Sequence, residues 1–178
     1  MPLIRPSRDE DVAAITAIYA HHVLNGTGTF ETEAPSAADM AQRRQDVLAR
    51  RLPWLVAEND QGRVIGYAYC NWFKPRAAYR FSAEDSIYLH PDAAGHGLGR
   101  VLLTELARHA EDAGVRKLIA VIGDSANAGS IGVHRSLGFA PVGTICGAGW
   151  KFGRWLDIVL MEKPLGEGTR TAPVETAA

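Results

Sequence analysis

A glycine-rich loop between an apolar run and a helical segment is the part of this sequence best suited to chemistry. Gly95, Gly97 and Gly99 follow the run 86–90 and precede a periodic stretch that predicts a helix over 100–113. Glycines let successive backbone N–H groups point the same way, and the unpaired N–H groups that open a helix favour an anion. We therefore predict a pyrophosphate site. The G-x-G-x-G spacing, with no Lys-Ser/Thr behind it, fits neither a dinucleotide fingerprint nor a P-loop.

Two adjacent acids and one histidine have side chains suited to proton transfer. Glu84 and Asp85 come just before or at the start of an expected strand, and His134 lies in a short expected helix. A carboxylate can accept a proton, and an imidazole can accept or donate one near neutral pH. Acids at a strand end are also often merely solvated, and a lone histidine on a helix is as often a hydrogen-bonded, half-buried side chain. For each of these residues, a role in proton transfer and a purely structural role both stay open.

Turn residues and apolar periodicity divide the chain into the elements that must position these groups. Ser7, with Glu10 three residues later, is typical of a helix N-cap, and Gly114 and Gly138 are typical of helix ends. The expected strands are 3–5, 54–58, 64–70, 85–90, 117–122, 139–144 and 154–161. The expected helices follow Ser7 and cover 36–51, 100–113 and 125–137. Residues 59–62 predict a hairpin turn, and 25–33 predict a loop that contacts ligand.

This order of elements predicts an α/β (α+β) fold. A strand, a crossover helix and a buried apolar strand over 85–122 form a βαβ unit, and the other strands favour antiparallel pairing. We expect a mixed, mostly antiparallel sheet of about six to seven strands with helices on both faces. Residues 1–165 are predicted to form a single domain, and the Gly, Thr, Pro, Glu and Ala content of 166–178 is typical of a disordered tail.

The composition argues against several classes of partner. The formal net charge is −1 with Lys and Arg scattered, so we expect no nucleic-acid partner. No apolar run approaches the roughly 20 residues that span a bilayer, so we expect no membrane partner and a cytoplasmic location. Cys70 and Cys146 lie far apart without clustered histidines, which argues against a metal site and a disulfide framework.

The features that carry a family resemblance are the strand, the loop His90-Pro-Asp-Ala-Ala-Gly-His-Gly-Leu-Gly99, the helix, the buried strand, residues 127–130 and residues 137–139. In these features the chain resembles the GNAT superfamily of acyl-CoA-dependent N-acetyltransferases. The resemblance covers nearly the whole chain and implies the GNAT fold. Residues 29–33, 53–57, 83–88 and 149–157 are similar to the phosphinothricin and methionine sulfoximine acetyltransferase branch. That narrower resemblance implies transfer of acetyl from acetyl-CoA to the α-amino group of a small amino acid or analogue, often by a homodimer, in detoxification.

The resemblance assigns the catalytic roles. Glu84 stands where this branch keeps a glutamate and would accept a proton from the amine, directly or through one water. His134 replaces the tyrosine of many GNAT proteins, as in this branch, and would protonate the departing thiolate or share the role of base. Neither Cys70 nor Cys146 has a visible activating base, which favours direct transfer over an acetyl-cysteine intermediate.

The cofactor contacts are expected along the glycine loop and the two elements beside it. The backbone N–H of Leu89 is the expected oxyanion donor. The residues expected to bind acetyl-CoA are Leu89, Gly95, His96, Gly97, Leu98, Gly99, Arg100, Asn127 and Ser130. Ala94 departs from the Gln or Arg usual in GNAT loops, so that side-chain contribution is missing, but the backbone N–H groups of Gly95, Gly97 and Gly99 remain available to the pyrophosphate. Asn127 is also a good helix N-cap, a role compatible with cofactor binding.

The acceptor's carboxylate needs a cation. Lys74, Arg76 and Arg80 precede Glu84, and we expect one of them to bind it. Phe30 and Tyr88, with Trp72 and Tyr79, are candidate pocket walls, although aromatics at strand spacing are more often core residues. Residues 150–155 would complete either the pocket or a dimer interface.

Two other functions remain open at this point. Acetylation of a peptide N-terminus or a lysine would favour an open acidic groove, and the three cations before Glu84 argue against that. A non-catalytic acyl-CoA sensor would keep the loop and lack a base, and the presence of Glu84 and His134 argues against that.

Overall fold

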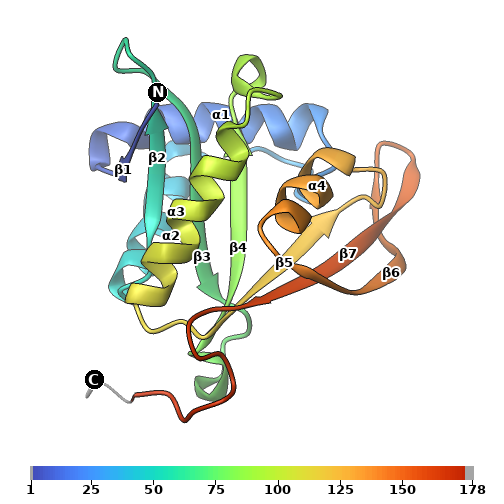
Figure 1. The fold of residues 1–178 in the computed structure, drawn as a ribbon. Coiled ribbons are helices and arrows are strands. Elements are labelled where there is room, and N and C mark those ends of the chain that lie inside the picture. Colours follow the sequence, from blue (N-terminus) through green and yellow to red (C-terminus); the bar gives the residue numbers. More distant parts are fainter. Residues whose placement is uncertain (1, 175–178) are drawn as a thin grey trace.

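The computed structural model describes residues 2–174 and forms a seven-stranded sheet with helices on both faces (Figure 1). The strands are β1 (Leu3–Pro6), β2 (Trp54–Glu58), β3 (Val64–Trp72), β4 (Ser82–Leu89), β5 (Lys117–Gly123), β6 (Ala140–Lys151) and β7 (Arg154–Pro164). The helices are α1 (Val12–Asn25), α2 (Ala37–Ala49), α3 (Leu98–Asp112) and α4 (Ala128–Ser136), with short 3-10 turns at Asp9–Asp11, Ala77–Tyr79 and Pro91–Ala93. The predicted mixed, mostly antiparallel sheet is confirmed.

The strand order β1-β2-β3-β4-β5-β7-β6 contains one parallel pair, β4 with β5. That pair is short: it runs from Ser82 opposite Lys117 to Asp85 opposite Ala120, although β4 continues to Leu89 and β5 to Gly123. Figure 1 shows the two strands diverging beyond this point. The sheet is therefore split between β4 and β5.

The helices cover the sheet because each presents an apolar stripe to it. In α3 the buried positions Leu98, Leu102, Leu106 and Ala110 recur every four residues, so they share one face, and that face packs on β2, β3 and β4. Helices α1 and α2 pack on β2, β3 and β4 from the opposite side (Figure 1). The stacked rings of Trp54 and Tyr67 belong to the core of the sheet.

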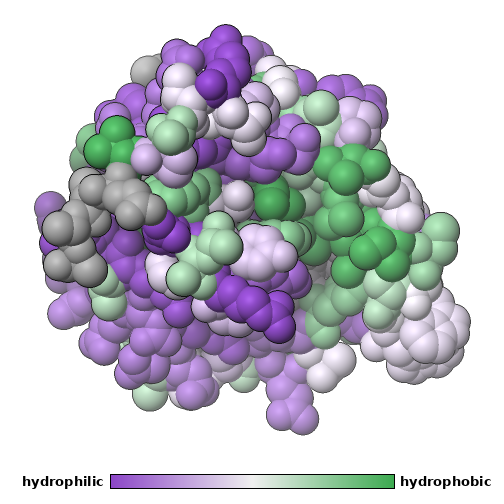
Figure 2. All heavy atoms as spheres, turned by 90° about the horizontal axis from the view of Figure 1, so that it is seen from below, coloured by the Kyte–Doolittle hydropathy of each residue, from purple (hydrophilic) through white to green (hydrophobic). Residues whose placement is uncertain are grey.

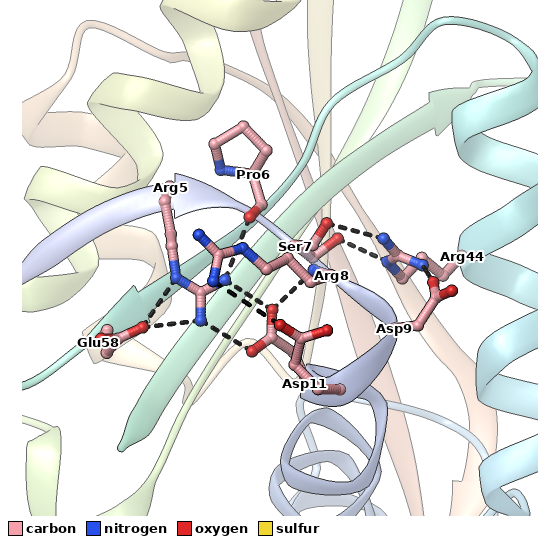
Figure 3. Close-up of polar contacts among 9 residues, drawn as sticks. Arg5, Pro6, Ser7, Arg8, Asp9, Asp11, Arg44 and Glu58 are labelled. Carbon is pink, nitrogen blue, oxygen red and sulfur yellow. Dashed lines mark hydrogen bonds and ion pairs between the residues drawn. The ribbon is translucent and has the colours of Figure 1, made fainter. Parts of the chain in front are cut away.

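The start of the chain is held by two arginines rather than by the predicted N-cap. Ser7 does not cap α1: its hydroxyl accepts a hydrogen bond from Arg44 Nε, 2.7 Å away, and a 3-10 turn capped by Arg8 comes first. Arg44 also donates to the Ser7 carbonyl and to Asp9, and Arg5 binds both oxygens of Asp11 (Figure 3). The capping prediction failed because a buried guanidinium from α2 uses the hydroxyl.

Other boundaries also differ from those predicted. Strand β4 begins at Ser82, so Glu84 and Asp85 lie inside a strand and not at its end. Strand β6 runs to Lys151, beyond the predicted end at 144, because pairing with β7 extends it through a glycine-rich segment. Helix α4 begins only after Asn127, which is its N-cap as expected.

The segment after Leu165 was predicted to be a disordered tail. Within its described part, Arg116 donates hydrogen bonds to the Gly168 carbonyl and to the Thr171 carbonyl and hydroxyl. Residues 175–178 of that predicted tail lie outside the described residues. Across residues 2–174, no helix has the length and apolarity that a membrane crossing requires.

Candidate active site

A cleft of about 830 Å³ opens at the split in the sheet. Most of the predicted site residues line it, namely Phe30, Glu84, Tyr88, Leu89, Gly95, Gly97, Gly99, Arg100, Asn127, Ser130 and His134. Of the other predicted residues, His96 is exposed on the loop and Leu98 is buried in the core. Lys74, Arg76, Arg80, Trp72 and Tyr79 are not among the lining residues.

The start of α3 leaves backbone donors free at the edge of the cleft. No side chain caps this helix, and its N-cap residue, Gly97, has a φ of 81°. Gly95 has a φ of 82°, and a Cβ at either position would meet nothing within 4 Å. The two glycines are therefore needed for their left-handed backbone and not for space. An uncapped N-terminus of a 15-residue helix can bind a phosphate through its N–H groups.

The split exposes backbone groups of two strands to the cleft. His90 N donates to Ile65 O on β3, and this register turns the peptide groups of Ile87 and Leu89 away from β3 and toward the split. Likewise, Asp124 N bonds Asp157 O, so Val121 and Gly123 present their peptide groups to β4. Extended amide-bearing ligands can pair with such edges. By the same register, the N–H of Leu89 faces the split.

His22 on α1 holds the end of β4 and was not singled out from the sequence. Its Nε2 lies 2.8 Å from the Leu89 carbonyl, which must be the acceptor, so Nε2 carries the proton. Burial lowers the pKa of His22. A neutral His22 therefore fixes the last peptide of β4 without adding charge.

Glu84 and His134 lie on opposite faces of the sheet. Side chains alternate along a strand, so Glu84 and Tyr88 share the face covered by α1, whereas Asp85 and Ile87 face α3 and α4. Burial raises the pKa of Glu84, the charge of Asp85 raises it further, and Lys74 lowers it. A carboxyl with a raised pKa is a stronger proton acceptor once it is ionised.

His134 is buried, and both of its ring nitrogens have partners. Nδ1 lies 2.8 Å from the Ser130 carbonyl, and Nε2 lies 2.8 Å from Asp85 Oδ2. Burial alone lowers the pKa of His134, but the Asp85 carboxylate and the Ser130 carbonyl together outweigh it, so the pKa is raised. The other oxygen of Asp85 has no hydrogen-bond partner among the described residues. Proton donation by His134 would require one of its two hydrogen bonds to break.

The loop before α2 carries a second carboxylate, Glu31. Burial alone would raise the pKa of Glu31, but two hydrogen bonds from Arg43, at 2.6 and 3.1 Å, and one from the Tyr19 hydroxyl lower it. Glu31 is therefore a fixed negative charge, in contrast to Glu84. The sequence predicted a loop over 25–33 that contacts ligand but no role for Glu31 itself, because its partners lie in α1 and α2.

The remaining predicted groups have simple structural settings. Asn127 Oδ1 accepts from Ser130 N at 3.1 Å, and its Nδ2 lies 3.4 Å from Gly123 O, so it links α4 to the end of β5. Burial and the charge of Asp85 raise the pKa of Cys70. Cys146 is exposed on β6, away from the lining residues. Within the described residues, no three His, Cys, Asp or Glu side chains form a group suited to a metal ion.

Fold and cleft together define an acyltransferase of the GNAT class, in which a split parallel strand pair meets an uncapped helix. The model of the acetyltransferase (GNAT) family matches residues 7–139. The chain belongs to that family.

Individual members of the family are similar to this chain over almost its whole length. The phosphinothricin N-acetyltransferase of Alcaligenes faecalis is 50% identical over 96% of this chain and 86% of its own length. The L-methionine sulfoximine/L-methionine sulfone acetyltransferase of Pseudomonas aeruginosa is 40% identical over 96% of this chain and 98% of its own. A crystal structure of a Sinorhizobium meliloti phosphinothricin acetyltransferase in complex with AcCoA superposes with a TM-score of 0.95, at 46% identity over 98% of this chain and 94% of that one.

Proposed function

We propose that this protein transfers the acetyl group of acetyl-CoA to the α-amino group of small amino acids or their analogues, such as phosphinothricin, methionine sulfoximine and methionine sulfone. The names of the relatives at 50% and 40% identity support this acceptor class. The observation that carries the proposal is Glu84, a half-buried carboxyl with a raised pKa in a cleft that also contains a free helix N-terminus.

The free donors of the site fit acetyl-CoA. The first N–H groups of α3 would hold the pyrophosphate, and the open edges of β4 and β5 would hold the amides of the pantetheine arm. Arg100, exposed at the start of α3, adds a positive charge beside the pyrophosphate. When bound, acetyl-CoA would supply the activated acetyl group for the transfer.

Three groups of the protein then act on the reaction. Glu84 takes the proton from the acceptor's ammonium, because an amine must be neutral to attack the acyl carbon. The N–H of Leu89 donates to the acyl oxygen as negative charge develops on it. As the new C–N bond forms and the C–S bond breaks, the nitrogen releases its second proton and the thiolate takes one, and we assign the delivery of that proton to His134, which lines the cleft and is hydrogen-bonded to Asp85. The cation for the acceptor's carboxylate was predicted among Lys74, Arg76 and Arg80, none of which is among the residues that line the cleft.

A thiol-release assay with acetyl-CoA tests the proposal. The acceptors are phosphinothricin, methionine sulfoximine, methionine sulfone, free amino acids and short peptides with a free N-terminus. Turnover confined to amino acids and analogues is the expected result. Turnover of peptides alone would overturn the acceptor assignment, and acetyl-CoA binding without turnover of any amine would favour a sensor.

We further propose that the protein acts in the cytoplasm as a homodimer. Strand β6 is at the edge of the sheet, and an edge strand can pair with a second copy of itself. At its end, Trp150, Phe152 and Trp155 are 58%, 55% and 65% exposed. Figure 2 shows hydrophobic residues gathered on the side where Figure 1 places β6 and β7. The chain has a net charge of only −1, so this aromatic surface is better suited to contact a second copy of the chain than a strongly charged partner.

A further inference from the structure

The loop that bounds the acceptor side of the cleft is fastened to β6. Lys151 is 4% exposed, and its Nζ donates to the carbonyls of Gly26 and Thr29 at 2.8 and 2.9 Å. Burial lowers the pKa of Lys151. A buried ammonium stabilises the structure only when its donors are satisfied, so these two bonds keep the loop in one position. Phe30, which lines the cleft, is the residue after Thr29.

The ring of Phe30 occupies space left by two glycines. A Cβ at Gly149 on β6 would come within 3.2 Å of three ring carbons of Phe30, and a Cβ at Gly123 on β5 would come within 3.0 Å of a fourth. Gly149 does not have a positive φ, unlike Gly147 and Gly153 on the same hairpin. The backbone at 149 therefore admits any residue, and the ring is what excludes a side chain there.

We propose that Gly149 determines acceptor specificity by setting how far the Phe30 ring projects into the cleft. With a hydrogen at position 149, the ring lies back against β6 and leaves room for the side chain of the acceptor. A methyl group there would push the ring toward the cleft, because Lys151 and Thr29 prevent the loop from moving with it. The room for long acceptor side chains would then shrink, while the acetyl-CoA contacts at α3 would stay unchanged. This inference rests on the proposed function.

The test compares Gly149→Ala with wild type on two acceptors that differ by one methylene, methionine sulfone and S-methylcysteine sulfone. We expect the ratio of kcat/KM for the longer over the shorter acceptor to fall about tenfold, since one methylene is worth about 10-fold or more in a filled pocket. The KM for acetyl-CoA should not change. Gly143→Ala is the matched control: it adds the same methyl group to the same strand, where nothing lies within 4 Å, and should keep the wild-type ratio.

The double variant Phe30→Ala/Gly149→Ala shows whether the ring transmits the effect. The inference requires this variant to have the same acceptor ratio as Phe30→Ala alone. An unchanged ratio in Gly149→Ala, or an equal fall in the Phe30→Ala background, would overturn it. If Gly149→Ala does not fold, recovery of folding in the double variant supports the clash, and continued misfolding contradicts it. Wild-type protein that acetylates neither sulfone nor any other amino acid would overturn the proposed function, and this inference with it.

Discussion

Glu84 and Glu31 are two carboxylates of one cleft whose surroundings shift their pKa values in opposite directions. Among the described residues, no hydrogen bond to the Glu84 carboxylate contributes to its pKa, and burial raises that pKa. Glu31 receives hydrogen bonds from Arg43 and Tyr19, and its pKa is lowered. A base must bind and release a proton in the working pH range, so Glu84 is suited to catalysis and Glu31 to holding the loop in place.

Glu84→Gln is expected to lower kcat by about 10²–10⁴-fold, the usual contribution of a general base, with little change in the KM for acetyl-CoA. Because Glu84 must be ionised, wild-type activity should rise with pH through a midpoint above the ordinary value of about 4.3. The variant should lose this acidic limb. Glu33→Gln, at an exposed position, serves as the control and should keep it. Full kcat of Glu84→Gln at its pH optimum would place the base elsewhere.

Asp85→Asn is expected to lower the pKa of His134. The Asp85 carboxylate counteracts the burial that disfavours a charged imidazole, and the amide removes that charge. In wild type, the raised pKa contributes stability that is fully present below the unfolded value of about 6.5 and is lost as pH rises through the folded value. An NMR titration of the His134 ring should show the shift. A His134 pKa that is the same in both proteins would mean that the pair is not coupled.

The two ends of helix α3 can be compared, because each carries a glycine with a positive φ. Gly97→Ala should weaken acetyl-CoA binding about tenfold, because a non-glycine residue at a φ of 81° costs about 1–2 kcal/mol. Gly97→Asn should lose less, because asparagine tolerates this backbone. Gly114, with a φ of 88° and open space at the other end of the helix, is the control. Calorimetric titration should show normal affinity for Gly114→Ala, and an equal loss there would contradict a local role for the loop.

Helix α2 is joined to the start of the chain by Arg44. Its guanidinium is 8% exposed and makes three hydrogen bonds at 2.6–2.7 Å, which a lysine cannot reproduce. Arg44→Lys should lower the free energy of unfolding by about 2–3 kcal/mol, the usual worth of bonds to a buried charge. Arg108 makes a similar set of bonds at 55% exposure, and Arg108→Lys should cost no more than about 0.5 kcal/mol. If urea unfolding shows that both variants lose the same free energy of unfolding, burial of the Arg44 guanidinium is not the cause of the loss.

At the scale of the whole molecule, the edge strand β6 predicts self-association. Replacing Trp150 and Trp155 together with serine should shift sedimentation from dimer toward monomer, because most of the aromatic surface of the hairpin is removed. Leu24→Ser, on α1 at the same 58% exposure as Trp150, should leave the assembly unchanged. Wild-type protein that sediments as a monomer at all concentrations would exclude the homodimer.

The parts of the fold that could be predicted from sequence are those with local causes. Gly97 and Gly114 mark helix ends because their backbone needs a positive φ, and Asn127 caps α4 through its own side chain. The start of β4 was missed because acidic residues are uncommon in strand interiors. Asp85 is stabilised there by His134, 49 residues away.

The same limit applies to the site. The glycine loop could be found because all its groups are consecutive in the chain. The loop carrying Phe30 is positioned by Lys151, which is 125 residues from Gly26, and no spacing rule joins them. The length of β6 was also underestimated, because its glycine-rich sequence disfavours a strand and only pairing with β7 shows one.

Glu84 and Asp85 are consecutive residues that serve opposite faces of one strand. The insertion or deletion of a single residue upstream in β4 would exchange the faces of the two carboxylates, placing the acceptor-side acid under α4 and the partner of His134 under α1. Substitutions can change either carboxylate separately, but a change in length alters both at once. During divergence, this strand can therefore vary in composition much more readily than in length, and any new acceptor preference must arise in the loops that surround it.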